Sequence, residues 1–177
     1  GGFFPMKEVK LYDVAPDVLD RMAHGGVFFT VQDKSGRCNT MNIGWGSLSC
    51  YWNGPVFIAP IRHNRYTYEL LQNADSFTVS VPLDDGMKEA LTLVGTRHGN
   101  EVDKYALAHL TPLDALSVNG KVIGQCALHI ECRIALTLPM DPEAMDPAVR
   151  ERWYGDGDFH TLYFGQVVAC YRTDIDD

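Results

Sequence analysis

The stretch from Lys121 to Leu138 alternates between apolar and polar side chains more regularly than any other part of the chain. Successive side chains of a strand point to opposite faces, so this alternation predicts one long strand with a single face in a core. The apolar face would hold Val122, Gly124, Cys126, Leu128, Ile130, Cys132, Ile134, Leu136 and Leu138. The other face would hold Gln125, His129, Glu131 and Arg133.

This alternation also bears on a possible metal site, because Cys126, His129 and Cys132 have the spacing C-x-x-H-x-x-C. On a strand, the two cysteines point into the core and the histidine points away from it, so the three cannot bind one ion together. We therefore expect no zinc site here, and interpret the cysteines as small core residues.

Other segments read as further strands and as short helices. Strands are expected over 26–33, 55–62, 76–82 and 161–172, and helices over 13–24, from Asn64 onward, and over 84–95. Ser76, Thr78 and Ser80 would face solvent or a ligand groove, while the segment 161–172 is apolar on both faces and needs cover on both sides. Several short strands with few long helices indicate a mostly β fold, a barrel or sandwich with peripheral short helices.

Length and charge limit the classes of function. The 177 residues suit one domain over 1–177, and a net charge of -8 argues against nucleic acid or an anionic membrane as partner. Five cysteines, none in a C-x-x-C pair, fit reduced thiols and a cytoplasmic location. No apolar run is long enough to span a bilayer.

The densest run of glycine, aromatic and arginine signals extends from Asn39 to Pro82. In an extended segment, Gly44 and Gly46 remove the bulk from one face on either side of Trp45. A flat ring system lying against the bare backbone would explain the two glycines. A β-bulge beside a core tryptophan explains them equally well, and the residues alone leave both interpretations open.

An anion site is predicted just downstream. Asn64 can cap a helix, which would bring its side chain together with Arg62, Arg65 and Thr67 at a helix N-terminus. Free N–H groups, two guanidinium groups and a hydroxyl make a phosphate site without a glycine loop. The alternative is two solvated arginines at an ordinary cap.

The interpretation of two later segments stays open. Lys104 falls in a short helix after a glycine-bearing loop, and its charge alone favours a solvated helix face. The loop Asp141–Asp158 holds a brief helix with Asp146 as its cap and Pro147 as its first residue, ending near Gly155. It would be a lid, a partner contact or only a surface insertion, with the insertion favoured.

With these residues in view, the chain resembles the flavin reductase-like, FMN-binding split-barrel family, and within it the flavoredoxin-type proteins. The resemblance rests on five segments in order. They read NTMNIGWGS, RHNRYTYELLQNADSFTVSVP, GTRHGNEVDKYALAHLTP, LHIECRI and HTLYFGQVVACY, and together they cover nearly the whole chain from about Gly25.

The resemblance implies a Greek-key split barrel and a homodimer that holds FMN near its interface. It implies flavin-ring contacts from Met41, Asn42 and Trp45, with Ser47 along the ring or ribityl chain. It assigns the phosphate to Arg62, Asn64, Arg65 and Thr67, and adds Lys104 and His129 beside the flavin. The chain departs from the family pattern at His98, Asn100, Tyr105 and Asn42. These departures concern the reactive edge of the flavin more than FMN binding.

The resemblance favours an FMN-dependent oxidoreductase, an NAD(P)H-dependent flavin reductase in particular. No G-x-G-x-x-G follows a strand, so NADH or NADPH would bind in the flavin groove itself. A non-enzymatic FMN electron carrier between protein partners is the second hypothesis, and a cofactor-free interaction module is the third. No side chain is assigned as catalytic.

Overall fold

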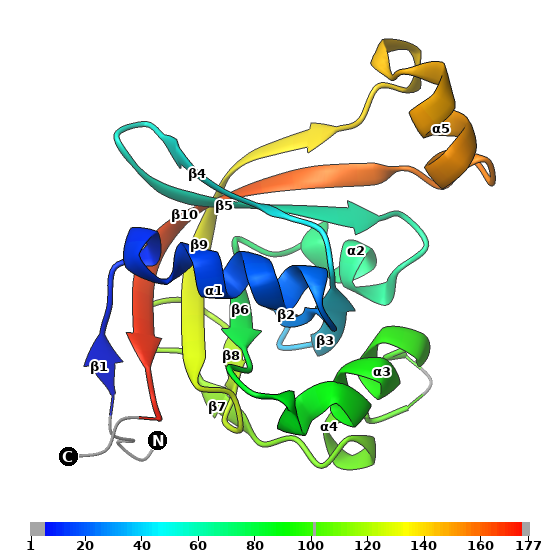
Figure 1. Cartoon of the computed structure of the whole chain (residues 1–177). Helices are drawn as coiled ribbons and strands as arrows, with labels where there is room; N and C mark the ends of the chain where they lie inside the picture. The colour runs from blue at the N-terminus through cyan, green and yellow to red at the C-terminus, as the bar shows by residue number, and fades with distance from the viewer. Residues whose placement is uncertain (1–5, 101, 175–177) are drawn as a thin grey trace.

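An antiparallel β-sheet dominates the computed structural model, which describes residues 6–100 and 102–174 (Figure 1). The sheet has eight strands in the order β3-β2-β6-β9-β10-β5-β4, with β1 paired to β10, and β7 and β8 form a separate two-stranded sheet. The strands of the large sheet are β1 Lys7–Glu8, β2 Val27–Gln32, β3 Cys38–Ile43, β4 Ser47–Tyr51, β5 Gly54–Arg62, β6 Ser76–Val81, β9 Leu128–Pro139 and β10 His160–Arg172. The small sheet consists of β7 Pro112–Asp114 and β8 Lys121–Ile123. The expected mostly β, split-barrel type of fold is confirmed.

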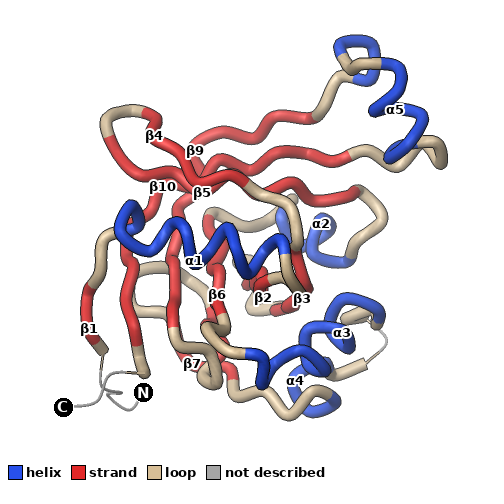
Figure 2. The backbone as a smooth tube through the Cα atoms, in the orientation of Figure 1, coloured by secondary structure: helices blue, strands red, loops and turns tan. Residues whose placement is uncertain are grey.

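Helices lie around the strands rather than between them (Figure 2). Their bounds are α1 Leu11–Ala23, α2 Tyr66–Leu71, α3 Lys88–Thr96, α4 Lys104–Leu107 and α5 Pro147–Tyr154, with short 3-10 turns at Asp85–Met87 and Pro142–Ala144. The helix expected at 13–24 is confirmed, two residues earlier at its start. The helix expected at 84–95 begins with a turn capped by Asp84 and ends at Thr96, so Gly95 lies inside it rather than after it.

The main core is built by alternate side chains of the large sheet together with α1 and α2. Phe29, Phe57 and Phe77 meet there, and all three are buried. A Cβ at Gly165 would lie 2.4 Å from the Phe77 ring, so only glycine fits this position of β10. A second cluster lies outside the large sheet, where α3, α4 and β8 cover Phe28 of β2.

The prediction of one strand over 121–138 is wrong, because the chain turns between β8 and β9. Cys126 N–H donates to the carbonyl of Ile123 across this turn, and Gly124 N–H donates to Thr111. The alternating pattern continues through the turn because each strand buries one face of its own. Cys126 consequently lies in the outer cluster and Cys132 in the main core.

The polar face of β6 is buried, which corrects the expectation that it faces solvent or a ligand groove. Thr78 Oγ1 donates to the carbonyl of Lys121, and Ser80 Oγ accepts from the N–H of Ile123. The small hydroxyl side chains thus dock the β8 segment onto the large sheet. Sequence alternation alone shows that one face is polar, but not that another segment covers it.

The paired ends of β9 and β10 extend away from the barrel and carry α5 at their far end, on the side opposite to β1 (Figure 1). Register pairs place Leu138, Leu162 and Pro60 in one row, and Leu136, Phe164 and Ile58 in the next. Leu136 and Leu138 are 39% and 46% exposed. This outer face, defined by these six residues, is apolar, and it is exposed at Leu136 and Leu138 while Phe164 is buried.

Within the described residues, no helix is both long and apolar enough to cross a bilayer.

Candidate functional site

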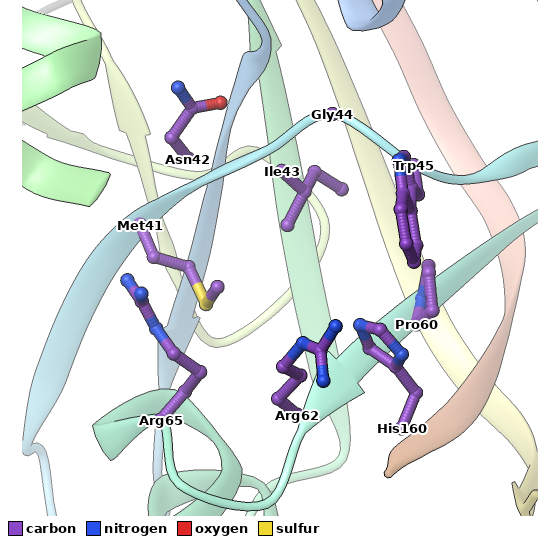
Figure 3. A pocket seen from close by; sticks show the side chains of 9 residues that line it. All are labelled: Met41, Asn42, Ile43, Gly44, Trp45, Pro60, Arg62, Arg65 and His160. Carbon is purple, nitrogen blue, oxygen red and sulfur yellow. The ribbon is translucent and has the colours of Figure 1, made fainter. Parts of the chain in front are cut away.

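A cavity of about 240 Å³ opens where β3 ends and where β5, α2 and β10 meet. It lies at the end of the outer apolar face, with which it shares Pro60. Figure 3 shows the side chains that line it. They are Met41, Asn42, Ile43, Gly44, Trp45, Pro60, Arg62, Arg65 and His160.

Arg62 ends β5 directly opposite His160, the first residue of β10. Its guanidinium donates to two backbone carbonyls of the α5 region, from Nη1 to Asp158 at 2.7 Å and from Nη2 to Trp153 at 3.0 Å. The guanidinium also lies over the ring of Tyr154, 5.0 Å from its centroid. These contacts hold Arg62 in place and use two of its five N–H donors, so the others remain available to a ligand.

Arg65 provides the second cation of the cavity and is itself the N-cap residue of α2. Its Nη1 donates to the carbonyl of Gly95 in α3 at 3.0 Å, and burial lowers the pKa of the guanidinium. An arginine held among protein atoms in this way is suited to pairing with an anion, because less solvent screens its charge.

The predicted role of Asn64 as helix cap is wrong, since the α2 N-cap is Arg65 and no side chain caps the helix. Thr67 is fully buried and accepts a hydrogen bond from Asn39 Nδ2 at 2.8 Å. Of the four residues assigned to a phosphate, only Arg62 and Arg65 line the cavity. The contacts of Asn64 and Thr67 with a phosphate stay predictions.

The segment Gly44–Gly46 is a bend between β3 and β4, not part of a strand. A Cβ at Gly44 would lie 3.3 Å from the carbonyl of Met22, and one at Gly46 would lie 3.1 Å from Met22 Sδ. Close packing against α1 therefore accounts for both glycines. Trp45 is 43% exposed at the cavity mouth, so the alternative of a core tryptophan is wrong.

Asn42 separates the cavity from a neighbouring pocket of about 440 Å³ between α1 and α3. Its Nδ2 donates to the carbonyl of Gly25 at 2.9 Å, whereas its buried Oδ1 has no hydrogen-bond partner within the described residues. A Cβ at Gly26 would lie 1.7 Å from that oxygen, so glycine is required there. A buried, unpaired acceptor is costly and is well suited to an N–H of a bound molecule.

His160 lines the cavity, although it was not predicted as a site residue from the sequence. His160 is 6% exposed, its ring centroid lies 5.5 Å from that of Trp45, and its Nδ1 lies 2.7 Å from the hydroxyl of Tyr154. Burial, with the charge of Arg62 and then His63 adding to it, lowers its pKa to about 4, so the imidazole is neutral at pH 7. The only signal in the sequence was its place at the head of a strand that resembles the family.

The α5 region contacts three of the residues that line the cavity, Trp45, Arg62 and His160. Trp153 packs edge-on against Trp45, with ring centroids 5.2 Å apart, and Tyr154 stacks on Phe159. Asp146 caps α5 by accepting from Ala148 and Val149, as predicted. The residues of this loop hold Arg62 and contact Trp45, and its role as a lid, a partner contact or a surface insertion stays a prediction.

Two other predicted site residues, Ser47 and His129, lie outside the lining of the cavity. Ser47 is exposed at the start of β4. His129 is buried between Ser80, at 2.9 Å from Nδ1, and Thr173, at 3.2 Å from Nε2. The structure does not bring either of them to the cavity.

Lys104 is buried, at 4% exposed, which overturns the solvated helix face favoured for it. Its Nζ donates to the carbonyls of Thr40 and Val94, at 3.0 and 2.8 Å, and so ties α3 and α4 to β3. Burial, with the charge of Arg65 as a smaller cause, lowers the pKa of Lys104 to about 8. Its contact with a flavin stays a prediction.

Comparison with known proteins gives one matching family, described as the flavin reductase like domain, over residues 19–177. No curated protein matches the sequence.

Several solved structures share the fold. Flavoredoxin of Desulfovibrio vulgaris (Miyazaki F) is 20% identical with a TM-score of 0.67, covering 84% of this chain and 69% of its own. The FMN-binding domain of a flavin reductases-like enzyme from Shewanella baltica OS155 is 13% identical with a TM-score of 0.66, covering 98% and 80%. Flavoredoxin from Methanosarcina acetivorans is 24% identical with a TM-score of 0.64, covering 84% and 69%.

Proposed function

Since the chain belongs to the flavin reductase-like domain family, we propose that it binds FMN in the cavity and acts as an FMN-dependent oxidoreductase. One observation carries the proposal: Arg62 and Arg65, from two different elements, line one cavity together with the half-exposed indole of Trp45. A phosphate needs such convergent cations, and a flat ring can pack against an accessible aromatic side chain.

The residues present fit FMN at both of its ends. The free N–H donors of Arg62 and Arg65 suit the phosphate, since guanidinium groups pair well with phosphate oxygens. Met41 and Asn42 line the cavity at the end of β3, where their backbone would meet the polar edge of the ring. Trp45 offers a half-exposed indole at the mouth, against which an aromatic ring can pack.

The bound FMN would supply the redox chemistry, and the chain's own residues would bind, orient and shield it. The two arginine charges favour an anionic ligand, and the carbonyls of the α5 region hold one of them, Arg62, in place. NADH or NADPH is the proposed electron donor. It would bind in the same groove, because no separate dinucleotide fingerprint is visible in the sequence.

The test is an anaerobic titration of the FMN-loaded protein with NADH and then NADPH, following the visible absorbance of the flavin. Bleaching at a rate that supports turnover with free flavin as acceptor is expected. A protein that binds FMN but is bleached by neither donor would exclude the reductase and favour an electron carrier. A protein that stays colourless after FMN is offered would refute the whole proposal.

We also propose that two copies of this chain pair through the outer apolar face. Leu136 and Leu138 are too exposed for a monomer to leave uncovered without cost, and the face runs into the cavity at Pro60. A second copy seated there would cover the apolar rows and one open side of the cavity. This arrangement accounts for a cofactor site that the described chain encloses only in part.

A further inference from the structure

A buried hydrogen bond links the last residue of α5 to the first residue of β10. The hydroxyl of Tyr154 lies 2.7 Å from Nδ1 of His160, and the two side chains belong to residues only 5% and 6% exposed. A hydrogen bond of this length between buried groups restrains both the rotamer and the protonation pattern of an imidazole.

The direction of this hydrogen bond follows from the alternatives open to the hydroxyl proton. Its other neighbour is Met140 Sδ at 3.4 Å, and a thioether is a weak acceptor. The proton is better placed on the line to Nδ1, which is an imidazole nitrogen and closer. Burial raises the pKa of Tyr154, which keeps that proton on the phenol. A neutral imidazole that accepts at Nδ1 carries its own proton at Nε2.

The Nε2–H of His160 then needs an acceptor. No hydrogen bond to this nitrogen exists within the described residues, while the side chain lines the cavity beside Arg62 (Figure 3). The imidazole is nearly buried as a whole, so the cavity is the side from which an acceptor can reach this N–H. A ligand oxygen in the cavity would satisfy it.

We propose that Tyr154 is a positioning residue that holds His160 in the tautomer with Nε2–H directed at the cavity, where it donates to an oxygen of the bound flavin. The inference rests on the proposed function for the identity of the ligand. It assigns a purpose to α5, whose final residue contacts both His160 and Arg62. The helix α5 would thereby position two donors of the cavity, the Nε2–H of His160 and the guanidinium of Arg62.

The first measurement is made without flavin, by NMR of the protein labelled with ¹⁵N at its histidines. His160 is expected to show a proton on Nε2 and none on Nδ1 in the wild type. Tyr154→Phe keeps the ring over Arg62 but removes the hydroxyl, so it should give a mixture of tautomers. A proton on Nδ1 in the wild type would overturn the proposal, whether or not the protein binds FMN.

The second measurement is flavin affinity. Tyr154→Phe should weaken FMN binding about two- to tenfold, the range for one lost hydrogen bond. Tyr51→Phe is the matched control because Tyr51 is 46% exposed and its hydroxyl makes no hydrogen bond within the described residues, so its affinity should not change. In a His160→Gln background, Tyr154→Phe should have an effect of less than about twofold, since the two residues act together.

One result separates a positioning role from a structural one, and a second separates this inference from the proposed function. If Tyr154→Phe weakens FMN equally with and without His160, the effect does not pass through the histidine and the proposal fails. If wild-type protein shows the expected tautomer but binds no FMN, the proposed function fails, and a different oxygen-bearing ligand must be sought for the same donor.

Discussion

Replacing both cavity arginines with alanine is the most direct test of where the phosphate of FMN binds. Each guanidinium has donors left after its contacts with protein carbonyls, three on Arg62 and four on Arg65 by the count of five per side chain. A charge-assisted hydrogen bond contributes about 1.5–3 kcal/mol. Because the cavity is open to solvent on one side, we use the lower end for each arginine.

Two such interactions sum to about 3 kcal/mol, which corresponds to a loss of FMN affinity of roughly 150-fold. Riboflavin lacks the phosphate, so its affinity should fall less than about threefold. The assay is the quenching of flavin fluorescence on titration with protein, performed side by side for the two ligands. The ratio of the FMN loss to the riboflavin loss decides whether the two arginines bind the phosphate.

The arginines also support the fold, so the controls must separate a lost ligand contact from a protein that no longer folds. Removing them leaves the carbonyls of Trp153, Asp158 and Gly95 without these donors, so thermal unfolding of each variant must show a folded protein. Arg62→Lys with Arg65→Lys keeps both charges and should lose less FMN affinity than the alanine pair. Arg97→Ala removes an exposed arginine outside the cavity and should change neither ligand. Equal losses for FMN and riboflavin in a folded protein would refute the phosphate assignment.

Three further predictions concern stability and assembly. Lys104→Met should lower the free energy of unfolding by about 1–3 kcal/mol in urea, because the carbonyls of Thr40 and Val94 lose a buried donor; an unchanged stability would contradict this. Burial lowers the pKa of His129 to about 4, so the unfolded state binds more protons between pH 4 and 6.5 and stability is lost as pH falls through this window. The loss from this group should be about 2 kcal/mol at pH 5, and His129→Gln should show correspondingly less acid destabilisation; an equal pH dependence would count against the assignment. Leu138→Glu should convert a dimer to a monomer in light scattering, whereas Leu19→Glu, at an exposed position of α1, should not; a wild-type monomer would remove the dimer proposal.

Much of the fold could be predicted from local patterns. The strands around Phe29, Phe57, Phe77 and Tyr163 alternate or are continuously apolar, and α5 carries its own start signal in Asp146 and Pro147. Errors arose where local pattern and tertiary context differ. Alternation through 121–138 concealed a turn, and the hydroxyl face of β6 gave no sign that β8 would cover it.

For the site, the sequence by itself determined which cations stand beside a short helix and where the backbone is bare of side chains. Arg62, Arg65, Asn42 and Trp45 do meet at one cavity, because the hairpin of β4 and β5 sets the connection before β4 beside the end of β5. Tertiary structure alone decided the rest. Lys104 is buried because two carbonyls from β3 and α3 meet its ammonium, and His160 reaches the cavity because β10 pairs with β5 in a register that sets it opposite Arg62. Both outcomes depend on contacts between residues far apart in the chain, and the residue types and their spacing do not encode such contacts in any way that can be read locally.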